Sequence, residues 1–142
     1  MNKADKIKRK MAESMVRGRT SAENAKYGEL IKQTNEVQFL LAHVVLLRST
    51  FIDKDYQNLL ERATFGTLIN LFKACAKATP SMYSLLLLLQ RYKKNRDRLA
   101  HKMFSANKLT PAECKDTLIL GRHILTKLYV LGKIPKKLRP KI

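Results

Sequence analysis

Apolar residues in this chain recur at intervals of three and four, the spacing that places side chains on one face of an α-helix. The first such stretch covers residues 22–49 and includes the strongly apolar segment Phe39–Leu47. A surface helix needs only one apolar stripe, so this segment predicts a helix at the centre of a bundle. The repeating positions are Ile31, Thr34, Gln38, Leu41 and Val45, with Leu30, Val37 and Val44 beside them.

A second helix is predicted over residues 54–77, where an apolar face runs from Tyr56 to Phe72. Asp53 is a suitable N-cap for it. The segment Thr64–Gly66 interrupts the apolar pattern, and the pattern then resumes. Pro80 ends the helix, because the residue before a proline avoids helical geometry.

Two further helices are predicted over residues 81–104 and 111–131. The start of the last one is marked by Thr110 as N-cap, Pro111 at the first helical position and Glu113 in a capping box. Gly121 lies on its apolar stripe and predicts a close helix crossing. Gly132 ends the helix.

These elements predict an all-α fold, namely a four-helix bundle over residues 22–131. A basic N-terminal arm or short helix (1–21) and a basic C-terminal tail (132–142) flank it. The 142 residues include only five Gly, four Pro and no Trp, so long stretches run without helix breakers. A single domain of this length buries a core without disulfides or metals.

The net charge of the chain indicates what kind of partner the predicted fold binds. The chain has 29 Lys and Arg against 11 Asp and Glu, a formal net charge of +18. Such a surplus repels itself unless an anionic partner relieves it. Nucleic acid, and here RNA, is the expected partner, with an anionic membrane surface second. The alternative is that the basic surface only keeps the protein soluble.

Motifs for other chemistry are absent from the sequence. Cys75 and Cys114 stand apart among apolar or helical neighbours, which predicts buried reduced thiols rather than a disulfide or a metal site. No glycine-rich phosphate loop or nucleophile elbow occurs, and no cofactor is predicted. The basic N-terminus precedes no apolar signal core, and the run Leu85–Leu89 is too short to span a bilayer. A cytoplasmic location is expected.

One charged residue interrupts the apolar seam of the third predicted helix. The seam is formed by Leu85, Leu88, Tyr92, Arg96, Leu99 and Met103. A buried guanidinium is costly unless an anion pairs with it, so we expect Arg96 to face a cleft, an interface or a carboxylate.

Asp97 and His101 are four residues apart and share a helix face. Asp97 could accept the Nδ1 proton of His101 and leave Nε2 free for proton transfer. Arg96 and His101 are separated by about 140° on an ideal helix, so either the arginine bends round or a second copy of the chain completes the site. Lys93, Lys94, Arg98 and Lys102 could hold flanking phosphates, and Tyr92, one turn from Arg96, could stack on a base.

The segment Arg96–His101 resembles the R-x4-6-H motif of the HEPN superfamily, in which a polar residue often follows the arginine. The resemblance covers roughly residues 22–131. It implies metal-independent RNA cleavage by many members, which leaves a 2′,3′-cyclic phosphate and a 5′-hydroxyl. Arg96, Asp97 and His101 would be catalytic, and some members are toxins or antiphage effectors with a neutralising antitoxin. Some toxins of the superfamily carry a tyrosine where this chain has Met103.

Other interpretations remain open for the same residues. The charged residues around Arg96 could form ordinary ion pairs, and the domain could be a non-catalytic nucleic-acid-binding or regulatory module. His43 is expected to be a satisfied core histidine and His123 a partly exposed helix residue. A homodimer is the expected assembly, and a membrane-surface role of the arm is the third alternative.

Overall fold

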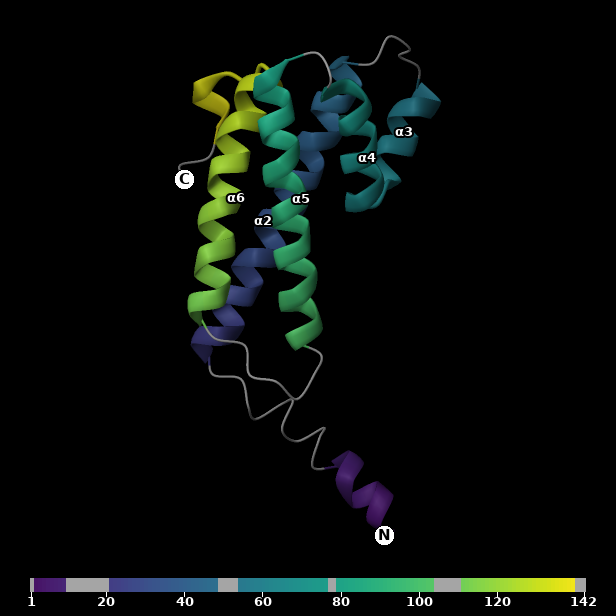
Figure 1. Cartoon of the computed structure of the whole chain (residues 1–142), viewed down its shortest axis with the longest axis vertical. Helices are drawn as coiled ribbons and strands as arrows, with labels where there is room; N and C mark the ends of the chain where they lie inside the picture. The colour runs from purple at the N-terminus through teal and green to yellow at the C-terminus, as the bar shows by residue number, and fades with distance from the viewer. Residues whose placement is uncertain (1, 10–20, 49–53, 77–78, 104–110, 140–142) are drawn as a thin grey trace.

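The computed structural model of the chain describes residues 2–9, 21–48, 54–76, 79–103 and 111–139 (Figure 1). All regular structure in these ranges is helical and none is strand, which confirms the all-α prediction. Residues 3–9 of the arm are helical with exposed side chains. The further elements are α2 (Ser21–Arg48), α3 (Lys54–Arg62), α4 (Phe65–Cys75), α5 (Pro80–Met103), α6 (Pro111–Leu131) and the 3-10 turn η2 (Lys136–Leu138).

Three long helices, α2, α5 and α6, form the body of the molecule (Figure 1). α2 packs most extensively on α6, and α5 packs on α6 as well. α2 and α6 run in the same direction, and α5 runs opposite to both. The short helix α4 packs on α2 and α5 near one end of these long helices, with α3 beside it.

The core fills the space between these helices with aliphatic and aromatic side chains. Its most deeply buried members include Val37, Leu41 and Val44 of α2, Phe72 of α4, Leu89 and Leu99 of α5, and Ile124 and Leu128 of α6. These positions follow the three-and-four spacing of the sequence, so the apolar pattern predicted most of the buried face of each helix. It was wrong for Ile31 and for Phe39 of the apolar segment of α2, which are 48% and 72% exposed.

The predicted interruption of the second helix separates α3 from α4. Thr64 has an extended backbone, and its hydroxyl accepts a hydrogen bond of 3.2 Å from the backbone N–H of Thr67. This is the usual role of an N-cap. The proposed caps Asp53 and Thr110 lie outside the described residues.

The end of α6 differs in detail from the prediction. The helix does end at Gly132, but the residue with left-handed backbone geometry is Lys133, with φ of 55°. The N–H of Lys133 bonds to the carbonyl of Val130 and that of Ile134 to Tyr129, which is a Schellman motif. Gly132 is small for another reason, because a Cβ there would lie 3.1 Å from the ring of His43.

Gly121 lies where a side chain of α2 packs directly against the backbone of α6. A Cβ built on Gly121 would lie only 1.9 Å from Oε1 of Gln33. The amide of Gln33 instead lies against the bare backbone and donates a hydrogen bond of 2.9 Å to the carbonyl of Leu118. The predicted helix crossing at Gly121 is therefore confirmed.

Candidate functional site

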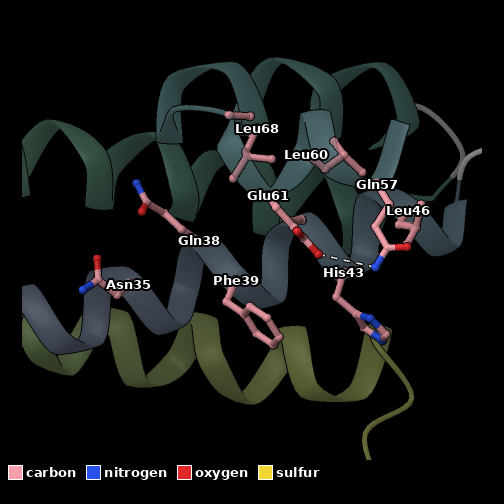
Figure 2. A pocket seen from close by; sticks show the side chains of 11 residues that line it. Asn35, Gln38, Phe39, His43, Leu46, Gln57, Leu60, Glu61 and Leu68 are labelled. Carbon is pink, nitrogen blue, oxygen red and sulfur yellow. Dashed lines mark hydrogen bonds between the residues drawn. The ribbon is translucent and has the colours of Figure 1, made fainter. Parts of the chain in front are cut away.

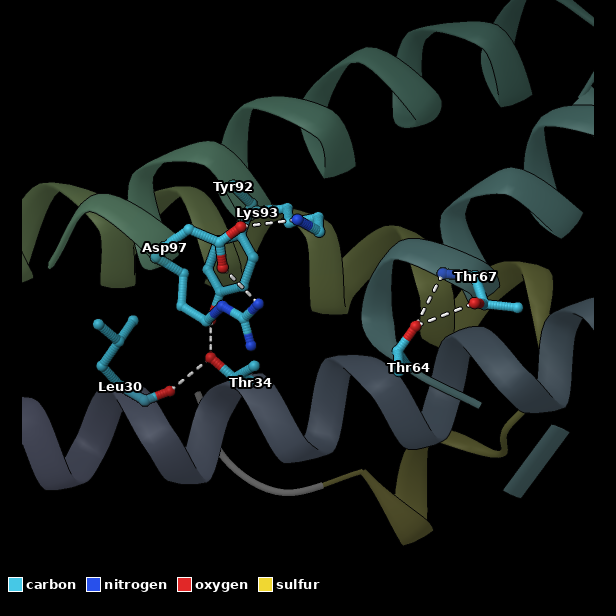
Figure 3. A network of polar contacts seen from close by, with 8 residues as sticks. Leu30, Thr34, Thr64, Thr67, Tyr92, Lys93 and Asp97 are labelled. Atoms are coloured by element: carbon cyan, nitrogen blue, oxygen red, sulfur yellow. Dashed lines mark hydrogen bonds and ion pairs between the residues drawn. The ribbon is translucent and has the colours of Figure 1, made fainter. Parts of the chain in front are cut away.

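On α5, beside the groove between α2 and α5, two cations surround one carboxylate. Nζ of Lys93 and Nη2 of Arg96 lie 2.6 and 2.5 Å from the two oxygens of Asp97. Figure 3 shows Lys93 and Asp97 projecting together from one helix. Each oxygen of the carboxylate accepts a hydrogen bond from one cation. Because two cations share one carboxylate, the cluster has a net charge of one positive unit.

Arg96 is held in place by an aromatic ring as well as by this carboxylate. Its guanidinium lies 5.4 Å from the centre of the Phe65 ring, within cation–π distance, and 27% of its side chain is exposed. Its Nε is shielded from solvent and has no hydrogen-bond partner in the described part of the chain. The expectation that Arg96 meets a carboxylate at an opening agrees with this arrangement, because Arg96 also lines a pocket of about 150 Å³ between α2 and α5.

The proposal that Tyr92 stacks on a base is contradicted by its position. The Tyr92 ring is fully buried, at 0% exposure, and stacks against Phe65 with ring centres 6.1 Å apart. Its hydroxyl donates to Oε1 of Gln33 at 2.9 Å. The same hydroxyl lies 3.1 Å from the hydroxyl of Thr34 (Figure 3). Burial raises the pKa of Tyr92 to about 12, so the phenol stays neutral. Tyr92 positions α5 on α2 and cannot reach a ligand.

Asp97 has a pKa below its ordinary value. Partial burial by itself raises the pKa, but the hydrogen bonds from Lys93 and Arg96 outweigh that effect. The partners of Asp97 are these two cations, and no hydrogen bond to His101 occurs among the described residues. The expected orientation of His101 by Asp97 is therefore not formed in the single chain.

His101 lies on the solvent face of α5 with other basic residues. At about 100° per residue, Lys94, Arg98 and His101 fall on one side of the helix, and all three are exposed. Lys102 differs from them, because it is half-buried and its Nζ lies 2.5 Å from a carboxylate oxygen of Glu113 on α6. The sequence-predicted residues thus divide into a groove cluster (Lys93, Arg96 and Asp97) and an outer stripe (Lys94, Arg98 and His101).

The first turn of α4 adds positive potential beside the groove cluster. A Cβ on Gly66 would lie 3.3 Å from Cε of Lys93, so the lysine stem runs against this turn. The amino end of a helix carries a partial positive charge, and α4 has no acidic residue in its first turn to offset it. The surroundings of Lys93 and Arg96 therefore favour an anion.

The two remaining histidines are less buried than expected, because His43 lines a pocket and His123 is exposed. The Nε2 of His43 lies 3.1 Å from the carbonyl oxygen of Gly132, so this half-buried ring is satisfied by the fold. His123 is exposed on α6. Cys114 is buried and Cys75 half-buried, and neither forms a disulfide.

A larger pocket lies elsewhere, between α2 and the pair α3 and α4. It has a volume of about 330 Å³ and a largely apolar lining that includes Leu46, Leu60 and Leu68 (Figure 2). It holds no cation, and its only carboxylate, Glu61, bonds to Gln57. Size alone does not make it the functional site, because the groups suited to polyanion chemistry gather around Arg96.

The neighbours that shape the Arg96 site were not predicted as part of it. Phe65 lies in the Thr64–Gly66 segment that interrupts the apolar pattern. Gln33 and Thr34 are buried polar residues of α2 that bond to Tyr92. The signal available in the sequence was the presence of polar residues at inward positions of an apolar repeat.

Within the described residues, no group of three or more His, Cys, Asp or Glu side chains is placed to hold a metal ion. None of the described helices combines the length and hydropathy needed to cross a lipid bilayer. Comparison of the chain with protein-family models, curated proteins and solved structures found no match.

Proposed function

We propose that this chain is a metal-independent RNA endonuclease of the HEPN type, built on a four-helix bundle. The observation that carries the proposal is the setting of Arg96. A guanidinium in an apolar seam is clamped by Phe65 and Asp97 at the mouth of a pocket, in a chain of net charge +18. A preorganised cation at an opening is suited to charge on a phosphoryl group.

Attraction of the RNA backbone comes from the outer stripe and the basic ends of the chain. Lys94 and Arg98 are exposed one turn apart on α5, and Lys136 and Lys137 are exposed in the tail. Contacts of this kind position a phosphate backbone without reading its sequence. They predict binding that weakens steeply as salt rises.

The chemistry uses the nucleophile that RNA carries itself. A neutral His101 takes the proton of a 2′-hydroxyl, whose oxygen attacks the adjacent phosphorus. The bond from phosphorus to the 5′-oxygen breaks, and that oxygen receives a proton from a histidinium or from water. Arg96 stabilises the charge that gathers on the non-bridging oxygens. The products are a 2′,3′-cyclic phosphate and a 5′-hydroxyl.

A second copy of the chain fits the separation of the two catalytic residues. On one helix Arg96 and His101 differ by about 140° in direction and about 7.5 Å along the axis. A two-fold dimer pairing the α5 faces brings Arg96 of one protomer near His101 of the other. The expected assembly is therefore a homodimer with RNA across its α5 helices.

The test is cleavage of a labelled RNA in the presence of EDTA by wild type and by His101→Ala. We expect the substitution to lower the rate by at least 100-fold, the usual scale of general acid–base catalysis. His123→Ala removes a comparably exposed histidine of α6 and serves as the matched control. Equal cleavage by wild type and His101→Ala, or metal-dependent products with 5′-phosphates, would falsify the mechanism.

A non-catalytic RNA-binding module is the second candidate, and one observation favours it. Both oxygens of Asp97 are occupied by Lys93 and Arg96, so in the single chain His101 lacks its orienting carboxylate. This candidate predicts the same salt-dependent binding, with loss of affinity in Arg96→Ala, and no turnover of RNA by wild type. Cleavage that disappears in His101→Ala contradicts it.

A further inference from the structure

The pocket beside Arg96 has a lining of unusual composition for this chain. It lies between residues 27–38 of α2 and the carboxyl-terminal half of α5, and Arg96 is its only charged lining residue. Ile31 and Ala100 line it with apolar atoms, and Asn35 and Gln38 line it with amides. The chain has 29 Lys and Arg, yet this recess has only one cation, so its composition differs from that of a surface that binds phosphates through many basic residues.

The two amides have hydrogen-bonding capacity that the fold does not use. Neither Asn35 nor Gln38 is hydrogen-bonded to a described residue, and both also line the larger pocket between α2 and the pair α3 and α4, in which Figure 2 shows them on α2. A primary amide offers two N–H donors and a carbonyl acceptor. Thr34, by contrast, is fully engaged, since its hydroxyl bonds to the carbonyl of Leu30 and contacts the hydroxyl of Tyr92.

The volume of the pocket limits what it can hold. A cavity of about 150 Å³ accommodates one six-membered aromatic ring. A flat ring with a polar edge suits a recess that has apolar sides and two amides. Arg96 lines the same recess and supplies a cation for the phosphate of a nucleotide whose base enters it.

We propose that this recess, termed the base pocket, accepts one unpaired pyrimidine base of an RNA strand. The ring lies against Ile31 and Ala100, its polar edge bonds to Asn35 and Gln38, and Arg96 holds the phosphate of the same nucleotide. The inference rests on the proposed RNA-binding function and adds a preference for the base. Bases in a duplex are stacked and paired, so the ligand is a single strand.

The experiment compares binding of short oligouridylate and oligoadenylate of equal length by fluorescence anisotropy, both with 2′-O-methyl sugars that lack the nucleophile and cannot be cleaved. Wild type should bind oligouridylate more tightly than oligoadenylate. The double variant Asn35→Ala/Gln38→Ala should lose about tenfold in affinity for oligouridylate, the scale expected for two lost hydrogen bonds, with little change for oligoadenylate. Asn70→Ala/Gln90→Ala removes two exposed amides outside the pocket and should leave both affinities unchanged.

A second measurement locates the ligand directly. Titration with uridine 3′-monophosphate should shift the side-chain amide NMR signals of Asn35 and Gln38, and those of Asn70 and Gln90 should stay in place. Equal shifts at all four amides would overturn the assignment.

The outcomes separate the base pocket from the function on which it rests. Salt-dependent RNA binding with no preference between the oligonucleotides overturns the base pocket and leaves the proposed function intact. Absence of RNA binding by wild type overturns both. If the double variant abolishes self-association and leaves RNA binding unchanged, a second copy of the chain occupies this groove and the base pocket is wrong.

Discussion

At the crossing of α2 and α6, the effect of a substitution at Gly121 on stability should change sign with the side chain at position 33. Gly121→Ala places a methyl group on the amide of Gln33, which bonds to both Tyr92 and Leu118. Displacing that amide loses two buried hydrogen bonds, each about 1 kcal/mol, and leaves polar atoms poorly satisfied. Alanine returns about 1 kcal/mol through its helix propensity. We expect a net destabilisation of about 2 kcal/mol.

The same substitution should act in the opposite direction once Gln33 is gone. Gln33→Ala alone is destabilising, because it removes both hydrogen bonds and leaves a void beside Gly121. In that background the alanine at 121 meets no amide and gains helix propensity, so it should stabilise by about 0.5–1 kcal/mol.

Urea denaturation of the four proteins measures this double-mutant cycle. The coupling energy between the two positions should be about 2–3 kcal/mol, since the clash and the lost hydrogen bonds exist only when both side chains are present. An equal loss of stability from Gly121→Ala in both backgrounds would refute the reasoning, because the cost would then not come from the contact with Gln33.

Three further predictions concern the ends of helices and the Asp97 cluster. Lys133→Gly should raise the free energy of unfolding by about 1 kcal/mol in urea denaturation, because glycine adopts the positive φ without strain. Thr64→Ala should lower it by about 1 kcal/mol through loss of the α4 N-cap, and Thr64→Ser should recover most of this. NMR titration should find the pKa of Asp97 below that of an ordinary carboxyl, so its ion pairs form above the usual pKa and are lost as pH falls through the lowered value. Lys93→Met should move this pKa upward.

The helices could be predicted from the sequence because their signals are local. The apolar repeat in residues 22–49 and Pro111 at the start of the last helix each act within a few residues, and α2 and α6 begin and end within a residue of expectation. The end of α6 shows the limit of such signals. Gly132 was expected only to end the helix, but the residue with left-handed geometry is Lys133, and a Cβ on Gly132 would meet the ring of His43 at 3.1 Å. That contact spans 89 positions in the chain and has no local signature.

The burial of Tyr92 was not predicted for the same reason, because it depends on contacts between distant parts of the chain. Its spacing from Arg96 places the two residues on one seam, and that prediction holds. Spacing along one helix does not tell whether the seam faces solvent or another helix. Tyr92 is enclosed by side chains from distant parts of the sequence, namely Gln33 and Thr34 on α2 and Phe65 on α4.

Asp97 shows why helix spacing predicts a set of neighbours but not the bonds among them. Lys93 lies four residues before it and His101 four residues after it, so both can reach the carboxylate. An ammonium group is charged throughout the neutral range, whereas an imidazole is largely neutral there, and a charge-assisted hydrogen bond is roughly twice as strong as a neutral one. The lysine therefore takes one oxygen, and Arg96 beside it takes the other. In a chain with 29 cations and 11 carboxylates, permanent cations compete for every acidic group, and a histidine keeps such a partner only where no lysine or arginine can reach it.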